Sequence, residues 1–405
     1  MALATARRTP QLTRALLPLG LIFLGVGIST ALVGPFLSLF LSTEVDAGPL
    51  QVTVFLVLAP LSGVLGSTLI GRLSDRRPIR RALLIGGAAA GMVGCALTAF
   101  VRDYWILLGL TVTAIAVANS LFPQSFAYAR QVLERDAPDR AAMGISALRT
   151  VFSLAWVAGP PLAAFLLHAG GFGWVYGTAA LMYALAALVG IGWLGEVEAP
   201  AAETAETEIS DTPDLARWTL LLTAAAFTLM QTPLTLAVQA LPLFIRTDLH
   251  GDVSDAGLVL GLCAALEIPL MLGLGALSTR LPLRLLLFAG AACGVGYYAL
   301  AAISSGVWVL FVAQILNALF IAAVSGLGIT YMQNMLPGHP GRATTLFTNS
   351  FPLGAMLAGP LFGVAQHFGF RYAYVICAVL CAAGLLLLTV VRPGTGYGGT
   401  RARTG

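Results

Sequence analysis

Long apolar stretches, separated by short polar segments, repeat along the whole 405-residue chain. An α-helix needs about 20 apolar residues to cross the roughly 30 Å hydrocarbon core of a bilayer. Twelve stretches reach this length and predict transmembrane helices over residues 15–41, 50–73, 82–101, 104–132, 141–168, 173–194, 217–245, 254–279, 283–303, 306–335, 342–367 and 371–391. We therefore expect an all-α, polytopic membrane protein.

Composition supports this prediction and excludes a soluble domain. Hydrophobic residues make up 58% of the chain and charged residues only 10%, whereas a soluble globular protein carries about 25% charged residues. The net charge of +4 does not indicate nucleic-acid binding, because the positive residues are spread over the ends of the apolar stretches instead of forming one patch. We expect a multi-pass protein in the bilayer.

The arginines also predict the orientation of the helices. All 22 basic residues are arginines. If the N-terminus lies in the cytoplasm, the outer side carries only Arg102, Arg246 and Arg371, and every other arginine outside the helix centres lies on the cytoplasmic side. This asymmetry follows the positive-inside rule and predicts that both termini are cytoplasmic.

One long polar segment interrupts the apolar pattern near the middle of the chain. Residues 195–216 are acidic and rich in Ala, Thr and Pro, a composition typical of a loop. The segment predicts a cytoplasmic linker between an N-terminal bundle of six helices, residues 1–194, and a C-terminal bundle of six, residues 217–405.

The two predicted bundles resemble each other in sequence. Tyr128 corresponds to Tyr331, and Gly159-Pro160 corresponds to Gly359-Pro360. The equivalent helices have the same orientation, which predicts a parallel repeat. Transporters built from such repeats bind their substrate near the bilayer midplane, between the two halves.

The segment GRLSDRRPIRR, residues 71–81, lies in the predicted loop between the second and third helices. It resembles the signature loop of the major facilitator superfamily, G-x-L-x-D-R-x-G-R-R, although Pro78 stands where a glycine is common. The residues that the resemblance assigns to a gating loop are Gly71, Asp75, Arg76, Arg80 and Arg81.

Two further segments narrow the resemblance. RTVFSLAWVAGPPLA in the fifth predicted helix and MQNMLPGHPGRATTLFTNS before and within the eleventh are similar to the bacterial sugar efflux transporters of that superfamily. The resemblance implies a secondary active transporter that exports sugars or sugar analogues across the inner membrane by alternating access, coupled to proton entry. A proton-coupled multidrug exporter of the same superfamily is the alternative.

The resemblance also implies a mechanical role for the gating loop. Asp75 is expected to accept hydrogen bonds from the start of the eleventh helix, near residues 341–344, because the free N–H groups of a helix N-terminus favour an anion. This contact would hold the cytoplasmic gate closed in the outward-facing state. The alternative is that the loop arginines only fix the topology.

Arg149 lies deep inside a predicted helix, about 14 Å beyond Arg140 at the cytoplasmic edge. A charge at this depth costs at least about 2.5–3.5 kcal/mol and must face water or a partner. Ser153 and Trp156 share its helical face, and Glu267 is an acid at similar depth in the eighth helix. We predict that Arg149 and Glu267 come within salt-bridge reach or share the substrate, and that together they couple proton entry to export. The alternative is a static ion pair that tethers the halves.

Other polar residues inside the apolar stretches complete a predicted sugar site, because amides both donate and accept hydrogen bonds and Trp156 offers a face for a sugar ring. The predicted substrate-binding residues are Asn119, Arg149, Ser153, Trp156, Gln231, Thr235, Gln239, Glu267, Gln314, Asn317 and Asn349. For each of the uncharged polar residues, the alternative is a hydrogen bond between neighbouring helices that contacts no ligand.

The sequence contains no feature of an enzyme in its apolar stretches. We find no catalytic triad, phosphate-binding loop or metal-ligand spacing, and all five cysteines lie in apolar segments. A membrane enzyme or sensor is therefore disfavoured, and we expect no cofactor and no metal. The predicted partners are a small sugar, protons and the lipid bilayer, and the protein is expected to be a monomer.

Overall fold

The computed structural model describes residues 2–136, 138–196, 214–336 and 340–391. Within these ranges every regular element is helical, as expected where lipid leaves backbone polar groups no other partners. The α-helices are α1 (Ala2–Val33), α2 (Leu37–Thr43), α3 (Pro49–Arg76), α4 (Arg80–Phe100), α5 (Tyr104–Leu110), α6 (Ala116–Ala118), α7 (Leu121–Asp136), α8 (Ala141–Trp193), α9 (Asp214–Thr247), α10 (Val253–Leu277), α11 (Leu283–Ala302), α12 (Val307–Met335), α13 (Pro340–Thr348), α14 (Ser350–Phe368) and α15 (Arg371–Val390). Three short turns, η1 (Gly34–Phe36), η2 (Thr111–Ile115) and η3 (Pro138–Arg140), connect some of them.

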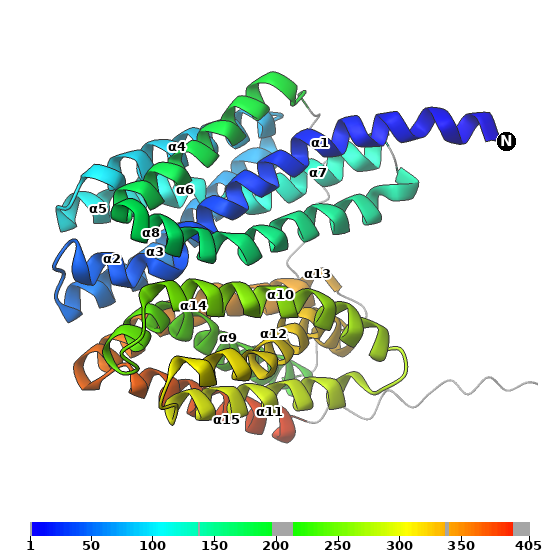
Figure 1. Ribbon diagram of the computed structural model, residues 1–405. Coiled ribbons are helices and arrows are strands. Elements are labelled where there is room, and N and C mark those ends of the chain that lie inside the picture. Colours follow the sequence, from blue (N-terminus) through cyan, green and yellow to red (C-terminus); the bar gives the residue numbers. More distant parts are fainter. Residues whose placement is uncertain (1, 137, 197–213, 337–339, 392–405) are drawn as a thin grey trace, which may run out of the picture.

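The helices form two layers (Figure 1). In the first layer, α1 and α4 pack along α8; in the second, α9 packs against α14 and α15, and α11 against α12. The first layer is built from α1 to α8 and the second from α9 to α15. Residues 197–213, which make up most of the predicted linker, lie outside the described residues.

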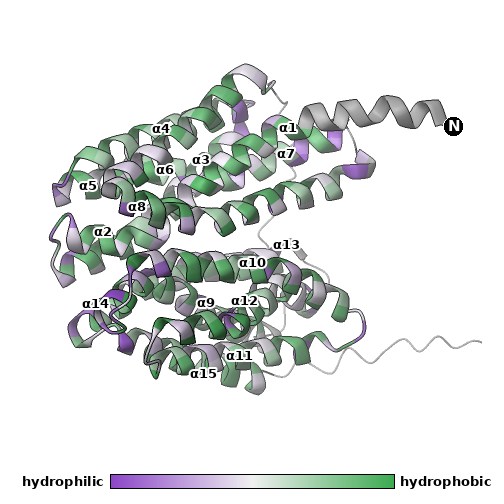
Figure 2. Ribbon diagram, viewed as in Figure 1, coloured by the Kyte–Doolittle hydropathy of each residue, from purple (hydrophilic) through white to green (hydrophobic). Residues whose placement is uncertain are grey.

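Ten helical stretches of the described chain, 20 to 51 residues long, are apolar enough to cross a membrane. The longest, Met143–Trp193, is long enough for two crossings, and Gly170 and Gly171 interrupt its helix. Gly171 has a φ of +71°, which a residue with a side chain rarely adopts. Large apolar side chains such as Leu69 and Leu188 are exposed, and hydrophobic residues cover both layers (Figure 2). The chain is therefore a polytopic, all-helical membrane protein, as predicted.

Three of the predicted helices are interrupted in the structure. The first changes from α1 to α2 through the 3-10 turn η1, which contains Pro35, a residue without a backbone N–H. The fourth contains the π-helical turn η2 shortly before Asn119, and the eleventh is divided into α13 and α14 at Asn349. Interruptions of this kind are frequent at functional sites. They leave the apolar pattern unchanged, so hydropathy did not predict them.

The two ends of the layers differ in charge and define a direction. We call the end with the turns at residues 44–48, 101–103 and 248–252 the arginine-poor end, on the left in Figure 1. The opposite end, with the turns at residues 77–79 and 278–282, is the arginine-rich end.

Most tryptophans mark these two ends. Five of the six are exposed and lie near helix ends or breaks, which is where tryptophan anchors a protein at the membrane–water interface; they are Trp105, Trp174, Trp193, Trp218 and Trp308. Trp156 differs, because it is half-buried and lies in the first half of α8, far from either end of that helical limb. An interfacial anchor does not explain its position.

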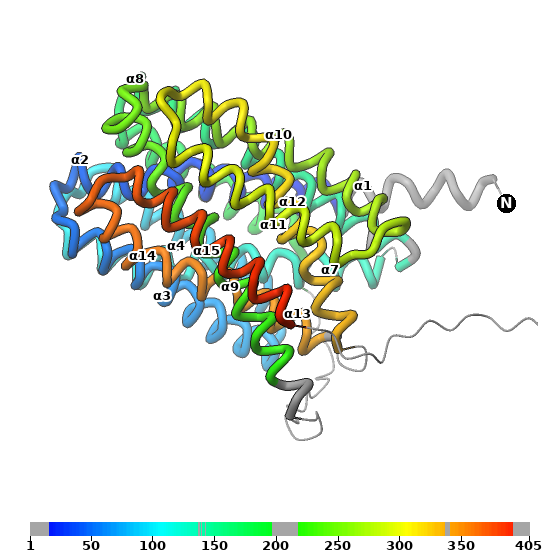
Figure 3. The backbone as a smooth tube through the Cα atoms, turned by 90° about the horizontal axis from the view of Figure 1, so that it is seen from below, coloured from blue at the N-terminus to red at the C-terminus, as the bar shows by residue number. Residues whose placement is uncertain are grey.

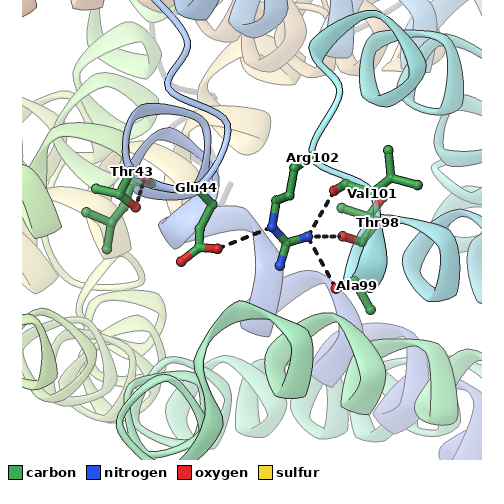
Figure 4. Close-up of polar contacts among 7 residues, drawn as sticks. Thr43, Glu44, Thr98, Ala99, Val101 and Arg102 are labelled. Carbon is green, nitrogen blue, oxygen red and sulfur yellow. Dashed lines mark hydrogen bonds and ion pairs between the residues drawn. The ribbon is translucent and has the colours of Figure 1, made fainter.

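Arg102 joins two turns at the arginine-poor end (Figure 4). Its Nε donates to the Glu44 carboxylate at 3.2 Å. One of its terminal nitrogens donates to the carbonyl oxygens of Thr98, Ala99 and Val101 at 2.9 to 3.2 Å. The last carbonyls of α4 thereby gain a cationic donor, and the end of α4 is tied to the end of α2.

Each layer has an equivalent arginine at the arginine-rich end. Arg81, at the start of α4, donates to the carbonyl oxygen of Ile191 near the end of α8 at 2.9 Å. Arg284, at the start of α11, donates to the carbonyl oxygens of Leu388 and Thr389 near the end of α15 at 3.3 and 3.2 Å. Cationic donors stabilise the unpaired carbonyls of a helix C-terminus. An internal repeat produces this kind of correspondence between layers.

Candidate functional site

The longest contacts between the two layers run along two pairs of helices, α8 with α10 and α3 with α14, and Figure 3 shows α3 beside α14. Glycines permit the close approach. A Cβ atom at Gly257 would lie 2.5 Å from the carbonyl oxygen of Pro160 in α8, and one at Gly359 would lie 2.7 Å from a methyl carbon of α3. Gly261 and Gly363, one helical turn further along, are similarly close to the opposite layer.

The four glycine contacts lie toward the arginine-poor end. The four glycines occupy the halves of α10 and α14 that are nearest to that end. Gln239 of α9 adds polar contacts, because its Nε2 donates to the Gly34 carbonyl at 2.9 Å and its Oε1 accepts from the Ser38 N–H at 3.2 Å. The layers are therefore closed against each other at the arginine-poor end.

The predicted gating loop lies at the opposite end. Asp75 forms an ion pair with Arg80 of its own loop at 2.9 Å, and the Asp75 side chain is 70% exposed. The predicted contact between Asp75 and residues 341–344 belongs to a conformation that is closed at the arginine-rich end, so it stays a prediction. The other residues of the loop lie in α3 or at the start of α4: Gly71, Arg76 and Arg81.

One face of α8 carries Arg149, Ser153 and Trp156. Spacings of four, three and four residues lead from Arg149 through these residues to Pro160, so all four share a helical face. Because Pro160 contacts α10, this face is turned toward the second layer. Arg149 is exposed, and Ser153 and Trp156 are half-buried.

Glu267 lies on α10 at a depth similar to that of Arg149. The contact between Gly261 of α10 and Val157 of α8 gives a common reference level. Toward the arginine-rich end, Glu267 lies about 9 Å from Gly261 along α10, and Arg149 lies about 12 Å from Val157 along α8. Among the described residues, however, neither side chain forms a salt bridge. Opposite charges therefore lie at similar depth in the two layers and form no salt bridge with each other in this conformation.

A chain of hydrogen bonds begins one helical turn before Glu267. Asn317 of α12 donates to Cys263 Sγ at 3.3 Å and to Gln314 Oε1 at 3.0 Å. Gln314 is 1% exposed and donates to the Tyr297 hydroxyl at 3.1 Å. The Gln314 amide is thus used within the second layer, whereas Oδ1 of Asn317 is buried and has no partner in the described part of the chain.

Gln231 of α9 has unmet hydrogen-bonding capacity. Its side chain is 2% exposed, and neither Nε2 nor Oε1 has a partner among the residues that the structure describes. An unpaired buried polar group costs about 1–3 kcal/mol, and buried polar groups in native proteins normally bind protein, water or a ligand. Gln231 is therefore the strongest ligand-binding candidate among the predicted amides.

The remaining predicted residues differ in their surroundings. Asn119 and Asn349 are exposed at the helix interruptions, and Thr235 is half-buried one turn after Gln231. In the described ranges, no three His, Cys, Asp or Glu side chains are grouped so that they could hold a metal ion.

The sequence matches the model of the Major Facilitator Superfamily over residues 19–239 and 223–404. The chain belongs to the major facilitator superfamily. A putative sugar efflux transporter of Deinococcus radiodurans is 38% identical over 388 residues, which are 93% of this chain and 98% of the relative. Sugar efflux transporter A of Dickeya chrysanthemi is 36% identical and covers 96% of this chain and 98% of its own length. The crystal structure of the nucleoside transporter NupG shares the fold, with a TM-score of 0.78 over 93% of this chain and 98% of that chain, at 12% identity.

As a member of this superfamily the protein is a transporter. The sequence analysis did not predict the glycines at which the two layers approach each other. The signal was available as two G-x-x-x-G pairs, residues 257–261 and 359–363, because small residues four apart let membrane helices approach closely. Nor did it predict that the sulfur of Cys263, a buried residue, accepts a hydrogen bond from Asn317.

Replacing Gly359 with valine is expected to slow substrate movement by the transporter about tenfold, because the added methyl groups collide with α3 and keep the layers apart at the arginine-poor end. The measurement is the initial flux of labelled substrate into proteoliposomes, normalised to folded protein. Gly86→Val is the matched control, since a Cβ at Gly86 meets no atom within 4 Å. Equal rates for G359V and G86V would contradict the closing role of Gly359.

Proposed function

We propose that the transporter exports a neutral sugar or sugar analogue by alternating access, coupled to proton entry. The observation that carries the proposal is the pair Arg149 and Glu267, opposite charges at similar depth on helices of the two layers. A purely structural pair of this kind contributes little net stability. The substrate class follows from the relatives of 34–38% identity that are named sugar efflux transporters.

The proposal includes twelve membrane helices in two parallel bundles, residues 1–194 and 217–405, joined by the linker 195–216. Ten stretches are long and apolar enough to span; counting Met143–Trp193 twice gives eleven, and α13 with α14 supplies the twelfth. The positive-inside rule assigns the arginine-rich end and both termini to the cytoplasm. The bacterial relatives support an inner-membrane location. A monomer suffices, because one chain contains both halves of the site.

In this orientation the described conformation is closed on the outer side and faces the cytoplasm. The glycine contacts and Gln239 close the outer end, and Arg149 and Glu267 lie further toward the cytoplasm. A sugar from the cytoplasm therefore reaches the charged pair first. Export requires the layers to separate at the outer end and to close at the inner end, where Asp75 would bind the helix start at residues 341–344.

The unmet hydrogen bonds favour a polyhydroxylated ligand. Gln231 and the Asn317 oxygen are buried without partners among the described residues, and a sugar hydroxyl can donate to one and accept from another. The Trp156 ring offers an apolar surface for the C–H face of a sugar. The proposal retains the further contacts expected from the sequence: Asn119, Ser153, Thr235, Gln239, Gln314 and Asn349.

A proton-coupled multidrug exporter is the second candidate, and one observation favours it. Phe122 forms an aromatic cluster with Phe126 and Phe152, with ring centroids 4.9 and 4.5 Å apart, and such a surface suits hydrophobic cations. Arg149 lies three residues before Phe152 on the same helix and would repel a cation. A neutral sugar is therefore the favoured substrate.

The coupling role makes a specific prediction for Glu267→Gln. Glutamine cannot take up a proton, so sugar transport driven by a pH gradient should be lost, whereas sugar–sugar exchange without a gradient should persist. Both are measured with labelled sugars in proteoliposomes. Asp255→Asn, at the start of the same helix, should keep gradient-driven transport. Undiminished gradient-driven transport by E267Q would refute the coupling role, and flux of cationic dyes but of no sugar would favour the second candidate.

The contrast between two glutamines tests the binding site. Gln231→Leu is expected to weaken sugar binding about tenfold while the thermal unfolding midpoint stays equal or rises, because an unpaired buried amide is removed. Gln314→Leu should lower the midpoint whatever its effect on sugar binding, since Tyr297 loses its partner. The sugar is chosen by a thermal-shift screen, because a ligand of the native state raises stability. An unchanged sugar Kd in Q231L, measured by calorimetry, would exclude Gln231 from the site.

A further inference from the structure

Gln239 lies beside the point where the first membrane helix changes from α1 to α2. The 3-10 turn η1 interrupts the helix there, and Pro35 within the turn has no N–H to donate. The Gly34 carbonyl and the Ser38 N–H lie on either side of Pro35. Backbone groups at helix ends and breaks need hydrogen-bond partners from elsewhere when no water is present.

The Gln239 side chain supplies such partners from the opposite layer. Its Nε2 donates to the Gly34 carbonyl at 2.9 Å, and its Oε1 accepts from the Ser38 N–H at 3.2 Å. The Ser38 hydroxyl donates in turn to the Gln239 carbonyl. Ser38 is fully buried. One amide thus bonds to the backbone on both sides of the break in the other half of the transporter.

We propose that Gln239 and Ser38 form a latch that holds the layers together at the arginine-poor end and so sets the balance between the two conformations of the transporter. The proposal rests on the alternating access proposed above but not on the identity of the substrate. Opening at this end moves α9 away from η1, so all three hydrogen bonds must break. The Ser38 N–H then loses Gln239 Oε1, and the Gly34 carbonyl keeps only the Leu37 N–H.

The latch differs in kind from the glycine contacts at the same end. Those contacts are close approaches of helix surfaces and fix how closely α10 and α14 approach the first layer, whereas hydrogen bonds are directional and also fix the orientation of the groups they join. In the described conformation the Gln239 amide is engaged by the backbone of the first layer. A sugar contact with Gln239, as expected from the sequence, therefore belongs to the conformation in which the latch is open.

The test measures the distance between the layers at the arginine-poor end by double electron–electron resonance. Spin labels are attached to cysteines at Leu50 and Ile303, which belong to different layers and are each 76% exposed. The parent protein carries alanine in place of its five native cysteines. The protein is kept in detergent or nanodiscs with neither sugar nor a pH gradient, so only the intrinsic conformational balance is measured.

Removal of the latch is expected to favour the open conformation. In Gln239→Leu the ratio of the long-distance to the short-distance population should rise about tenfold, and in Ser38→Ala it should rise less, because only one hydrogen bond is lost. Gln51→Leu is the matched control. The Gln51 amide also lies at this end but accepts a hydrogen bond from Gly48 within the first layer at 2.8 Å, so Q51L should leave the ratio near that of the parent.

An unchanged ratio in Q239L, or an equal rise in Q51L, would overturn the latch. If Q239L fails to fold, as judged by gel filtration and thermal unfolding, S38A replaces it, because this variant removes only one hydroxyl. An unchanged population ratio in S38A would then overturn the latch. The proposed function is tested separately by flux. A protein whose conformations respond to Q239L but that moves no sugar would refute sugar export and leave the latch intact.

Discussion

The high free energy of polar groups in hydrocarbon determines how this transporter is built. Helices satisfy the backbone internally, and apolar side chains face the lipid. The few polar side chains within the spans must then find partners in the protein. Gln314 donates a hydrogen bond to Tyr297 within its own layer, and Gln239 donates one to the Gly34 carbonyl, beside the break in the first membrane helix of the other layer. Gln231 has no partner among the described residues, and Arg149 and Glu267 have no salt bridge there. In the proposed function, Gln231, Arg149 and Glu267 are the unsatisfied groups that a substrate contacts.

Alternating access requires an interface that is tight but can separate. The glycine contacts between α8 and α10 and between α3 and α14 meet this requirement, because they bring backbones together without directional bonds. The hydrogen bonds of Gln239 are directional and add specificity at the same end. Close packing and a small number of polar bonds thus have separate roles: the first lets the layers approach, and the second favours one closed arrangement.

The sequence predicted the helices because bilayer thickness imposes a length of apolar residues that is visible locally. Depth along the helices also predicted that Arg149 and Glu267 occupy similar levels on facing helices. The interruptions at Pro35, Asn119 and Asn349 were not predicted, since each leaves the apolar pattern intact. Nor could the local sequence pattern predict that the Gln314 amide has a hydrogen-bond partner in the protein and the Gln231 amide has none among the described residues. Their difference depends on whether a distant residue, Tyr297, reaches the amide, and such long-range contacts have no local signal.

The central claim is that the face of α8 carrying Arg149 and Ser153 is reached by water and by the transported sugar. The most direct measurement uses a cysteine at Ser153, a nearly isosteric change, in protein without its native cysteines. The proposed site predicts that a charged, membrane-impermeant thiol reagent labels this cysteine from the arginine-rich end and that a transported sugar slows labelling several-fold. Labelling only by an apolar reagent dissolved in the lipid, or a rate that no transported sugar changes, would contradict the claim.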